Sequence, residues 1–409
     1  MINIAIIGGG AAGFFSAISA KENCPDARVV IFEKSQKLLS KVLVSGGGRC
    51  NVTNGCDSID ELCKAYPRGG RSLKKAFYAF NNKNTIEWFE SRGVPIVIQD
   101  DNRVFPVSQS SQSIIDCFLR EAERLGIEIK TGMGVKLLRP VGEQLELDFG
   151  KEGHQKLVFD KVIVATGGSP KRSGLEWLEK LNHRIEDPVP SLFSFNMPSE
   201  SIIGLMGVSV ENAIVGIQGT KLSSSGPLLI THWGMSGPAI LKLSAFGARI
   251  LSEMGYVFKI RVNWINEQNN ELVSAQLRDI SEEHPHKLLS NYRPFGLPAR
   301  LWQYLLERIE LQADKPWGEP GKKGLNRMVN VLTNDEYKVM GQTTFKEEFV
   351  TCGGVSLESV DLNTMQSKVC RNLYFAGEIL DIDAITGGYN FQAAWTTGWI
   401  AGRSAGSEF

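Results

Sequence analysis

Residues 1–14, MINIAIIGGGAAGF, set the architecture that we expect for the whole chain. The apolar run Ile4–Ile7 predicts a short strand of a parallel sheet that is buried on both faces. The glycines that follow form a G-x-G-x-x-G motif at Gly8, Gly10 and Gly13. In such a turn the first glycine permits the tight bend, the second lets a pyrophosphate approach the backbone, and the third lets the next helix pack against the strand. The stretch therefore predicts a dinucleotide phosphate held at a helix N-terminus.

The segment after the glycines supports this interpretation. Residues 14–21 continue as a helix, RVVIF at 28–32 has the composition of a second strand, and Glu33 follows it, 20 residues after Gly13. An acid at the end of the second strand accepts hydrogen bonds from the hydroxyls of an adenosine ribose. The alternative is a glycine-rich turn without a ligand, which leaves the ordered pattern of strand, helix, strand and acid unexplained.

Composition and charge limit the classes of function. The chain has 409 residues, 42% hydrophobic and 22% charged, which is ordinary for a globular protein of roughly two or three domains. Lys+Arg and Asp+Glu number 45 each, so we expect neither nucleic acid nor a membrane as a partner. No apolar run approaches about 20 residues, and we expect a cytoplasmic protein. The 7 cysteines lack a C-x-x-C pair and the 5 histidines lack metal-ligand spacing, which predicts reduced thiols and no metal site.

A second unusual stretch is KLLSKVLVSGGGRCNVTN at 37–54. The glycines at 46–48 give a backbone that can lie flat against a planar ligand. Arg49 and Asn51 would add one fixed cation and one amide beside it. A simple glycine-rich turn is the alternative.

Two cysteines near this stretch raise a redox alternative. Cys50 and Cys56 are separated by five residues, after a glycine run like that of the flavin disulfide reductases. The spacing exceeds that of those enzymes by one residue, which alters the register of the two sulfur atoms. We therefore favour the interpretation that both are core thiols.

The segment from residue 57 to residue 168 alternates helical and extended patterns. The predicted elements are helices at 72–92 and 113–125, a hairpin at 94–108, a strand at 126–130 and a meander from 134 to 165. The last strand of the meander ends at Thr166 and Gly167, so a glycine again follows a strand end.

Residues 191–345 have a different texture and predict a second domain. Alternating strands precede a helix at 237–251, and further helices are predicted at 266–283 and 297–311, with EPGKKG at 319–324 as a loop. His232 lies in a turn between a strand and a helix, where it could face a substrate. A histidine without a visible partner is more often a packed or capping residue, and this alternative stays open.

The C-terminal segment contains a further strand that ends at a glycine, as the strand before Gly167 does. NLYFA at 372–376 predicts a strand that ends before Gly377. DIDAITGGYN at 381–390 then leads into a helix, so its glycines lie at a helix N-terminus, where free N–H groups and the dipole favour negative charge. Opposite a flavin, such a helix end would stabilise the anionic reduced ring. An ordinary glycine cap is the alternative.

Six motifs, in order, carry a resemblance to a known family. They are Gly8–Gly13 with Glu33, SGGGRCNVTN, ATGG at 165–168, THWGMSGPAIL, TCGGVSL and the terminal YFAGEILDIDAITGGYNFQAAWTTGWIAG. In them the chain resembles the BaiN-like and YhiN-like bacterial flavoproteins, within the FAD-binding group that includes glutathione reductase and fumarate reductase. The match covers essentially the whole chain.

The resemblance implies an α/β fold with a discontinuous, Rossmann-like FAD-binding domain of the GR2 type. Residues 1–190 and 346–409 would form that domain, and 191–345 an inserted domain of β-barrel-like strands plus helices. It also implies a non-covalent FAD. Carried over by position, the residues expected to line the cofactor are Gly8, Gly10, Ala11, Ala12, Gly13, Glu33, Lys34, Gly47, Gly48, Arg49, Cys50, Asn51, Val135, Ala165, Thr166, Gly167, Gly377, Glu378, Gly388, Tyr389, Asn390 and Gln392.

These observations predict an FAD-dependent oxidoreductase that exchanges a hydride at flavin N5 with a small carbonyl-bearing or apolar substrate held between the two domains. The family pattern fixes no catalytic residue, and the candidates are Arg49, His232 and Tyr389. NAD(P)H would act as a transient electron donor in the substrate site, because the sequence has no second strand, G-x-G-x-x-G and helix unit. The alternatives are a thiol oxidoreductase that uses Cys50 and Cys56, and a flavin-binding sensor or scaffold without turnover. The oligomeric state is not predicted.

Overall fold

The structure is a computed structural model that describes residues 1–150, 156–343 and 350–407. Contacts divide the chain into two compact units. The first unit is Met1–Ser191 with Lys346–Phe409, and the second is Leu192–Phe345. The junction expected between residues 345 and 346 lies outside the described residues.

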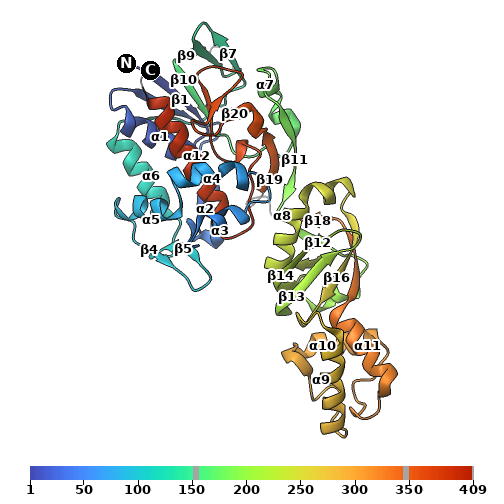
Figure 1. Ribbon diagram of the computed structural model, residues 1–409. Helices are drawn as coiled ribbons and strands as arrows, with labels where there is room; N and C mark the ends of the chain where they lie inside the picture. Colours follow the sequence, from blue (N-terminus) through green and yellow to red (C-terminus); the bar gives the residue numbers. More distant parts are fainter. Residues whose placement is uncertain (151–155, 344–349, 408–409) are drawn as a thin grey trace. The chain divides into compact units, whose positions relative to one another are not determined.

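A parallel sheet forms the centre of the first unit (Figure 1). Within the described residues it has seven strands in the order β20-β21-β22-β10-β1-β2-β6, of which β22, β10, β1, β2 and β6 run parallel. The strands are β1 Asn3–Ile7, β2 Arg28–Phe32, β6 Glu128–Lys130, β10 Lys161–Val164, β20 Val360–Asp361, β21 Gln366–Ser367 and β22 Leu373–Phe375. β1 lies between β10 and β2, which explains why Ile4–Ile7 are all buried. The predicted first and second strands are confirmed.

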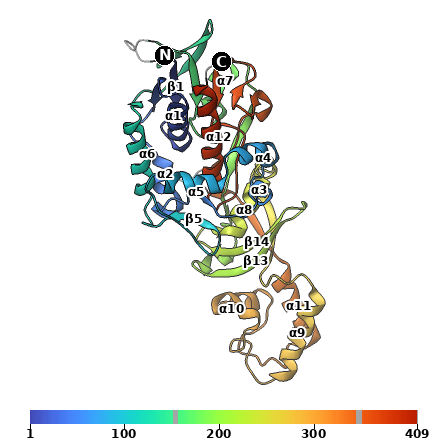
Figure 2. The same cartoon turned by 60° about the vertical axis from the view of Figure 1, so that its left-hand side comes forward.

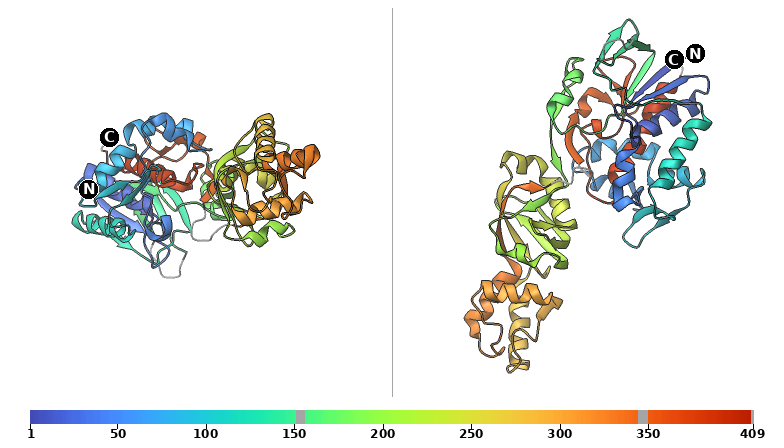
Figure 3. Two further views of the ribbon diagram at one scale, coloured as in Figure 1. Left: turned by 90° about the horizontal axis from the view of Figure 1, so that it is seen from below. Right: turned by 180° about the vertical axis from the view of Figure 1, so that it is seen from behind.

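Two helices from opposite ends of the chain cover one face of this sheet. α1 (Ala11–Asn23) and α12 (Tyr389–Gly406) lie side by side (Figure 2). Gly402 permits their close approach, since a Cβ at this position would lie only 2.3 Å from the carbonyl oxygen of Ser16. The rings of Phe15 and Trp395 pack between them with centroids 5.4 Å apart. The start of β1 and the end of α12 therefore lie near each other, as Figure 3 also shows.

A small antiparallel sheet packs on the other face. Its strands are β7 Leu137–Val141, β8 Gln144–Asp148 and β9 Leu157–Phe159. Phe32 of β2 contacts Phe149 and Phe159, with ring centroids 5.1 and 5.6 Å away. The meander predicted before β10 is thus confirmed as a covering layer.

The helix predicted at 72–92 is wrong, because the chain breaks there into two helices. α4 (Gly70–Ala79) and α5 (Asn82–Glu90) are separated at Asn81, whose side chain accepts hydrogen bonds from the N–H groups of Lys83 and Asn84. This capping interaction begins a new helix where the apolar spacing alone runs on. The helix predicted at 113–125 is α6 (Gln112–Arg124).

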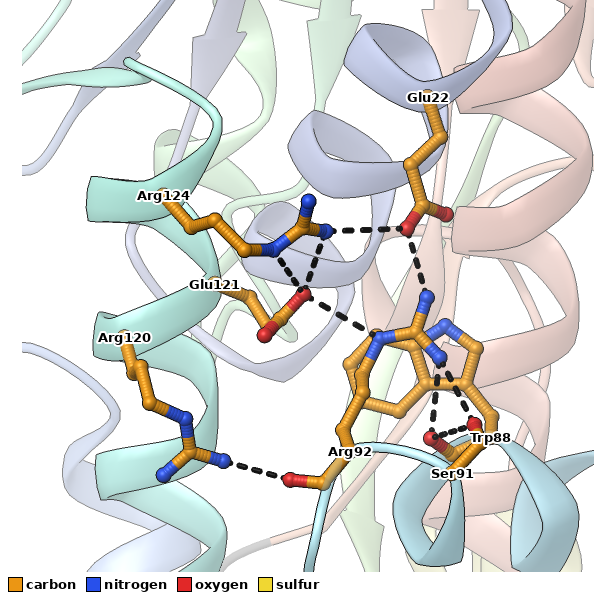
Figure 4. A network of polar contacts seen from close by, with 7 residues as sticks. All are labelled: Glu22, Trp88, Ser91, Arg92, Arg120, Glu121 and Arg124. Atoms are coloured by element: carbon orange, nitrogen blue, oxygen red, sulfur yellow. Dashed lines mark hydrogen bonds and ion pairs between the residues drawn. The ribbon is translucent and has the colours of Figure 1, made fainter.

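Charged residues tie α1, α5 and α6 together (Figure 4). Arg92 forms ion pairs with Glu22 at 2.6 Å and with Glu121 at 3.5 Å, and Arg124 pairs with Glu121 at 2.7 Å. The guanidinium of Arg92 also lies over the ring of Trp88, 4.0 Å from its centroid. Because Glu121 is buried, this network holds the outer helix α6 against the helices below it.

The remaining elements of the first unit are short. The predicted hairpin is β4 with β5, and β5 also pairs with β3. Their bounds are α2 Ser40–Gly48, β3 Thr53–Asn54, α3 Ile59–Lys64, β4 Ile96–Ile98, β5 Arg103–Pro106 and α7 Glu176–Glu179. β11 (Ile185–Ser191) and β19 (Val350–Val355) run antiparallel and carry the chain to and from the second unit.

The second unit contains a sheet that closes on itself. Within the described residues the order is β17-β16-β13-β14-β15-β12-β18. The bounds are β12 Ser194–Asn196, β13 Ser209–Ile217, β14 Ser223–Ile230, β15 Gly234–Ser236, β16 Val257–Asn263, β17 Asp335–Met340 and β18 Gln342–Thr343. β17 and β18 stand at opposite ends of this order, yet only Gly341 separates them in the chain. One continuous segment therefore joins both edges, which gives a barrel-like sheet.

In the described part of this unit, four α-helices accompany the sheet. α8 (Pro238–Glu253) packs on it, while α9 (Asn270–Glu283), α10 (Ala299–Arg308) and α11 (Gly321–Thr333) gather at one end of the unit (Figure 3). The loop predicted at 319–324 is wrong, because α11 begins inside it. Pro320 precedes the first helical residue, a position where its missing N–H costs nothing. Among the described residues, none of the helices is long and apolar enough to cross a membrane.

Candidate cofactor site

Four turns meet at one edge of the parallel sheet in the first unit. They follow the carboxyl ends of β1, β2, β10 and β22, which are neighbours and point the same way. The turns contain Gly8–Gly10, Glu33, Ala165–Gly167 and Gly377. The fold thus brings together predicted site residues that lie more than 300 positions apart in the chain. Ligands of open α/β sheets bind at this edge.

The geometry of the first turn is compatible with the roles predicted for its three glycines. Gly8 has φ +117°, and a Cβ there would lie 2.3 Å from the carbonyl oxygen of Ala165. A Cβ on Gly13 would lie 1.9 Å from the carbonyl oxygen of Gly8, so only glycine lets α1 sit this close to the turn. A Cβ on Gly10 would meet nothing within 4 Å. The turn is therefore tight on the protein side and open on the side where a pyrophosphate would bind.

Glu33 lies at the end of β2 with its carboxylate fixed. One oxygen accepts a hydrogen bond from the Gly9 N–H and the other from the Ser35 N–H, both at 2.8 Å. Each carboxylate oxygen can accept a further hydrogen bond, which suits the two hydroxyls of a ribose. Lys34 is exposed beside it, and Val135 is half-buried.

The glycine loop differs in part from the prediction, because α2 occupies its first half. Ser45 leaves the helical conformation, and the next three residues have φ of +58°, +68° and +82° at Gly46, Gly47 and Gly48. A Cβ on Gly47 or Gly48 would meet no atom within 4 Å. A bare, left-handed backbone that faces open space fits the flat ring system expected there.

The residues after the glycines are held by the protein. The guanidinium of Arg49 lies 4.3 Å from the centroid of the Phe105 ring and donates to Gln109 Oε1 at 3.4 Å. The side-chain oxygen of Asn51 accepts from the Val104 N–H at 3.2 Å. Arg49 is thus positioned as a fixed cation at the rim of the loop.

Neither thiol of the redox alternative is poised for reaction. Burial raises the pKa of Cys50 to about 12 and that of Cys56 to about 11. A reactive thiol needs a lowered pKa and access to solvent, and both side chains are buried. The environment favours the interpretation as core thiols.

The turn after β22 links the site to other elements. The Gly377 N–H donates to the hydroxyl of Thr397 in α12 at 2.8 Å. A Cβ on Gly377 would lie 2.8 Å from that of Ala12, which explains the need for glycine opposite α1. Glu378 accepts from Lys41 Nζ at 2.6 Å and from the Thr351 N–H at 2.8 Å. Glu378 thereby joins α2 to the first residues of β19.

The N-terminus of α12 has the predicted glycine entry. Gly388 has φ +89° and precedes the first helical residue, Tyr389. A Cβ on Gly388 would lie 2.3 Å from the carbonyl oxygen of Thr53. Burial raises the pKa of Tyr389 to about 12, so its hydroxyl stays protonated at neutral pH.

Two predicted cofactor residues have side chains that form hydrogen bonds within the protein. Asn390 accepts from the Ala384 N–H at 2.9 Å and donates to the Ala384 carbonyl at 3.0 Å. Gln392 is fully buried and accepts from the hydroxyls of Thr53 and Thr85 at 2.6 and 2.9 Å. These side-chain groups therefore already have partners within the protein.

The three catalytic candidates do not all belong to this cluster. Arg49 and Tyr389 lie in the first unit, next to the glycine loop and at the start of α12. His232 belongs to the second unit, where it is exposed and its ring lies 4.3 Å from that of Trp233. Its role stays a prediction.

A buried ion pair that no sequence pattern indicates lies at the loop before α12. Arg68 binds both carboxylate oxygens of Asp383, and the hydroxyl of Ser191 donates to Asp383 at 2.7 Å. Arg68 and Asp383 are 315 positions apart, so no local pattern pairs them. The sequence feature that could have indicated this pair is Asp383 itself, which lies in DIDAITGGYN, a segment already assigned to the site.

Comparisons with known proteins agree with this geometry. A family model, described as the HI0933-like protein Rossmann domain, matches residues 2–404. The chain is 28% identical to a 3-dehydro-bile acid delta(4,6)-reductase of Clostridium scindens, over 99% of both chains. It is also 28% identical to a ribosomal RNA dihydrouridine synthase of Escherichia coli, over 97% of this chain and 96% of that protein.

Two solved structures share the fold. The open conformation of a flavocytochrome c3 fumarate reductase gives a TM-score of 0.53 at 17% identity, over 99% of this chain and 78% of that one. A 3-ketosteroid delta1-dehydrogenase from Sterolibacterium denitrificans gives 0.52 at 13% identity, over 99% of this chain and 100% of that one. At these identities the likeness concerns the fold alone.

Proposed function

The chain belongs to the HI0933-like Rossmann family, and on that basis we propose that it exchanges a hydride between FAD and a carbon–carbon double bond conjugated to a carbonyl group. It is an FAD-dependent oxidoreductase. The proposal concerns the substrate class, the residues that serve it and the electron donor.

One observation carries the substrate class. Two of the full-length relatives are named for reactions on very different molecules, a 3-dehydro bile acid and a uridine in ribosomal RNA. Both names describe a carbon–carbon double bond that becomes saturated, and in both molecules that bond is conjugated to a carbonyl. A hydride then adds to the carbon remote from the carbonyl, and negative charge develops on the carbonyl oxygen. This requirement is common to both substrates, whatever their size.

When bound, FAD supplies the hydride at N5. The chain must then hold the substrate carbonyl and supply a proton to the carbon next to it. The hydroxyl of Tyr389, with a pKa of about 12, remains a hydrogen-bond donor across the working pH range. Arg49 offers a permanent cation. We assign both residues to stabilising the charge that develops on the substrate oxygen.

We also propose that NAD(P)H reduces the flavin from the substrate site, in the cytoplasm. No disulfide joins any of the seven cysteines, all of which lie in the described part of the chain, as expected in a reducing compartment. The substrate is proposed to be a small molecule, since the equal numbers of acidic and basic residues leave no net field for nucleic acid. The name of the Escherichia coli relative makes a uridine in RNA the second candidate.

A reoxidation screen tests the proposal. The purified flavoprotein is reduced without oxygen and mixed with a 3-oxo-4-ene steroid, a 3-oxo-4,6-diene steroid, ribosomal RNA or fumarate, while the flavin absorbance is followed. We expect rapid reoxidation by a steroid enone and none by saturated 3-oxosteroids, which serve as the matched control. Reoxidation by RNA alone would select the second candidate. A reduced flavin that no conjugated carbonyl compound reoxidises would contradict the proposal and favour a sensor or scaffold.

A further inference from the structure

Several hydrogen bonds hold the loop that leads into α12. We call residues 383–388 the cap loop. Ile385 N–H donates to the Ala65 carbonyl at 2.9 Å, and Asn54 donates to the Gly387 carbonyl at 3.2 Å. The hydroxyl of Tyr66 donates to the carbonyl of Tyr389 at 2.6 Å, just past the loop. Such a set of contacts fixes where the N-terminus of α12 points.

Asp383 is the charged anchor of the cap loop. Its side chain is fully buried, and Arg68 meets both carboxylate oxygens in a two-pronged ion pair. The backbones of the two residues also pair in an antiparallel bridge. Ser191, the last residue of the N-terminal segment of the first unit, donates a hydrogen bond to the same carboxylate. A planar guanidinium held this way sets both the distance and the angle of its partner.

We propose that Asp383, held by Arg68, is a positioning residue that fixes the cap loop so that the N-terminus of α12 faces the pyrimidine ring of the flavin and favours its reduced, anionic form. The positive end of a helix stabilises a nearby anion, and the effect falls off within one turn. A small displacement of the cap loop therefore weakens it. The inference rests on the proposed cofactor site and not on the proposed substrate.

The direction in which the reduction potential of the flavin changes distinguishes a positioning role of Asp383 from the effect of its charge. Replacing Asp383 by Asn removes a negative charge near the site, and by charge alone this raises the reduction potential of the flavin. Loss of positioning lowers the potential, because the helix end no longer meets the ring. Replacing Arg68 by Lys leaves both charges in place and removes the two-pronged contact with Asp383, together with the hydrogen bond that Arg68 donates to Ser191 at 3.5 Å. Charge alone then predicts no change, while positioning predicts a fall.

The second unit offers a matched control. Asp335 is also buried, and Arg308 donates to it at 2.8 Å, with a further hydrogen bond from Trp264 at 3.0 Å. All these partners lie in the second unit. Asp335→Asn thus breaks a similar buried ion pair without touching the cap loop.

The experiment measures the midpoint potential of each FAD-loaded variant by equilibration with a reference dye, together with the Kd for FAD and the melting temperature of the apo-protein. For Asp383→Asn and Arg68→Lys we expect roughly a tenfold loss of preference for the reduced form, a fall of about 30 mV for a two-electron couple. Asp335→Asn should lower the melting temperature and leave the potential unchanged.

A rise for Asp383→Asn with no change for Arg68→Lys would overturn the proposal in favour of a charge effect. Unchanged potentials with lowered melting temperatures in all three variants would reduce the ion pair to a structural role. If Asp383→Asn does not fold, the midpoint potentials of Arg68→Lys and the milder Ser191→Ala test the proposal. We expect a smaller fall in potential for Ser191→Ala. No substrate is needed, so failure of the reoxidation screen leaves this test intact.

Discussion

The carboxylate of Glu33 accepts a hydrogen bond from the backbone N–H of Gly9 at 2.8 Å. This contact joins the end of the second strand to the glycine turn after the first. The acid that would meet the ribose and the turn that would meet the pyrophosphate are therefore one rigid piece. Two parts of a dinucleotide would thus be recognised by groups that hold each other in place.

Glu33→Lys should weaken FAD binding. The change removes charge-assisted hydrogen bonds, each worth about 1.5–3 kcal/mol, so we expect Kd to rise by roughly 10- to 100-fold. Titration of FAD into the apo-protein measures it. Glu128→Gln is the matched control, since Glu128 ends in an exposed ion pair with Arg28. If Glu33→Lys binds FAD as tightly as the parent, the ribose assignment is wrong.

The flavin should be released by acid. The loop at 45–51 contains neither histidine nor tyrosine, and its nucleophile, Cys50, is a buried thiol with a pKa of about 12. A covalent bond to the ring therefore lacks a reactive partner there. Acid precipitation should leave the yellow colour in the supernatant. A yellow pellet would contradict the non-covalent assignment.

Cys50 and Cys56 should resist alkylation in the folded protein. Their pKa values of about 12 and about 11 are raised, so both remain protonated thiols at pH 8, and for Cys56 only about one molecule in a thousand carries a thiolate. Mass spectrometry after treatment with iodoacetamide should find them unmodified and the partly exposed Cys24 labelled. Reactivity should rise only as the pH approaches 11. Rapid labelling of Cys56 at pH 8, with loss of flavin turnover, would restore the thiol oxidoreductase alternative.

Residues 191–345 should be removable. Ser191 of β11 lies opposite Val350 of β19, so these two described residues, which flank the segment, are one strand spacing apart. Residue 190 would be joined to residue 346 by a short Gly/Ser linker, because insertions are tolerated where the flanking backbone is adjacent. We expect the product to bind FAD, seen as yellow protein after gel filtration. Colourless aggregates from several linker lengths would argue against these boundaries.

NADPH should reduce the flavin slowly and with weak saturation. A nicotinamide domain needs a second strand, glycine turn and helix, but Gly132 and Gly134 lack a third glycine, and Gly321 begins α11 without a preceding apolar strand. Donor and substrate would then compete for one site, with ping-pong kinetics. Stopped-flow absorbance and product-inhibition patterns measure this. A stable ternary complex with NADPH and substrate would refute the shared site.

The part of the site formed by residues 1–33 could be predicted from the sequence. The strand Ile4–Ile7, the glycine turn and Glu33 follow one another within 33 residues. Each requirement there is local, because a tight turn, a close helix and a strand end depend on neighbours in the chain. The glycines at 387 and 388 were readable for the same reason.

Local spacing and composition gave wrong predictions at two places, the helix at 72–92 and the loop at 319–324. The apolar pattern continues across Asn81, but the Asn81 amide caps α5 and ends the prediction of a single helix. In the same way, Leu325, Met328 and Leu332 bury one face of α11 and draw the segment at 321–324 into a helix despite its glycines. Packing against the rest of the unit outweighs intrinsic propensity at α11, whereas a local capping interaction decides the helix boundary at Asn81.

Residues 1–33 alone thus specify a dinucleotide fold, since the chemistry of a strand, a glycine turn and an acid is written in consecutive positions. The partners of buried polar groups are not written there. Arg68 finds Asp383 across 315 residues, and Gln392 finds Thr53 across 339. Such pairs form because a buried charge or amide must find a partner wherever the folded sheet and helices deliver one. That requirement acts on positions in space, so it becomes visible only once the chain has folded.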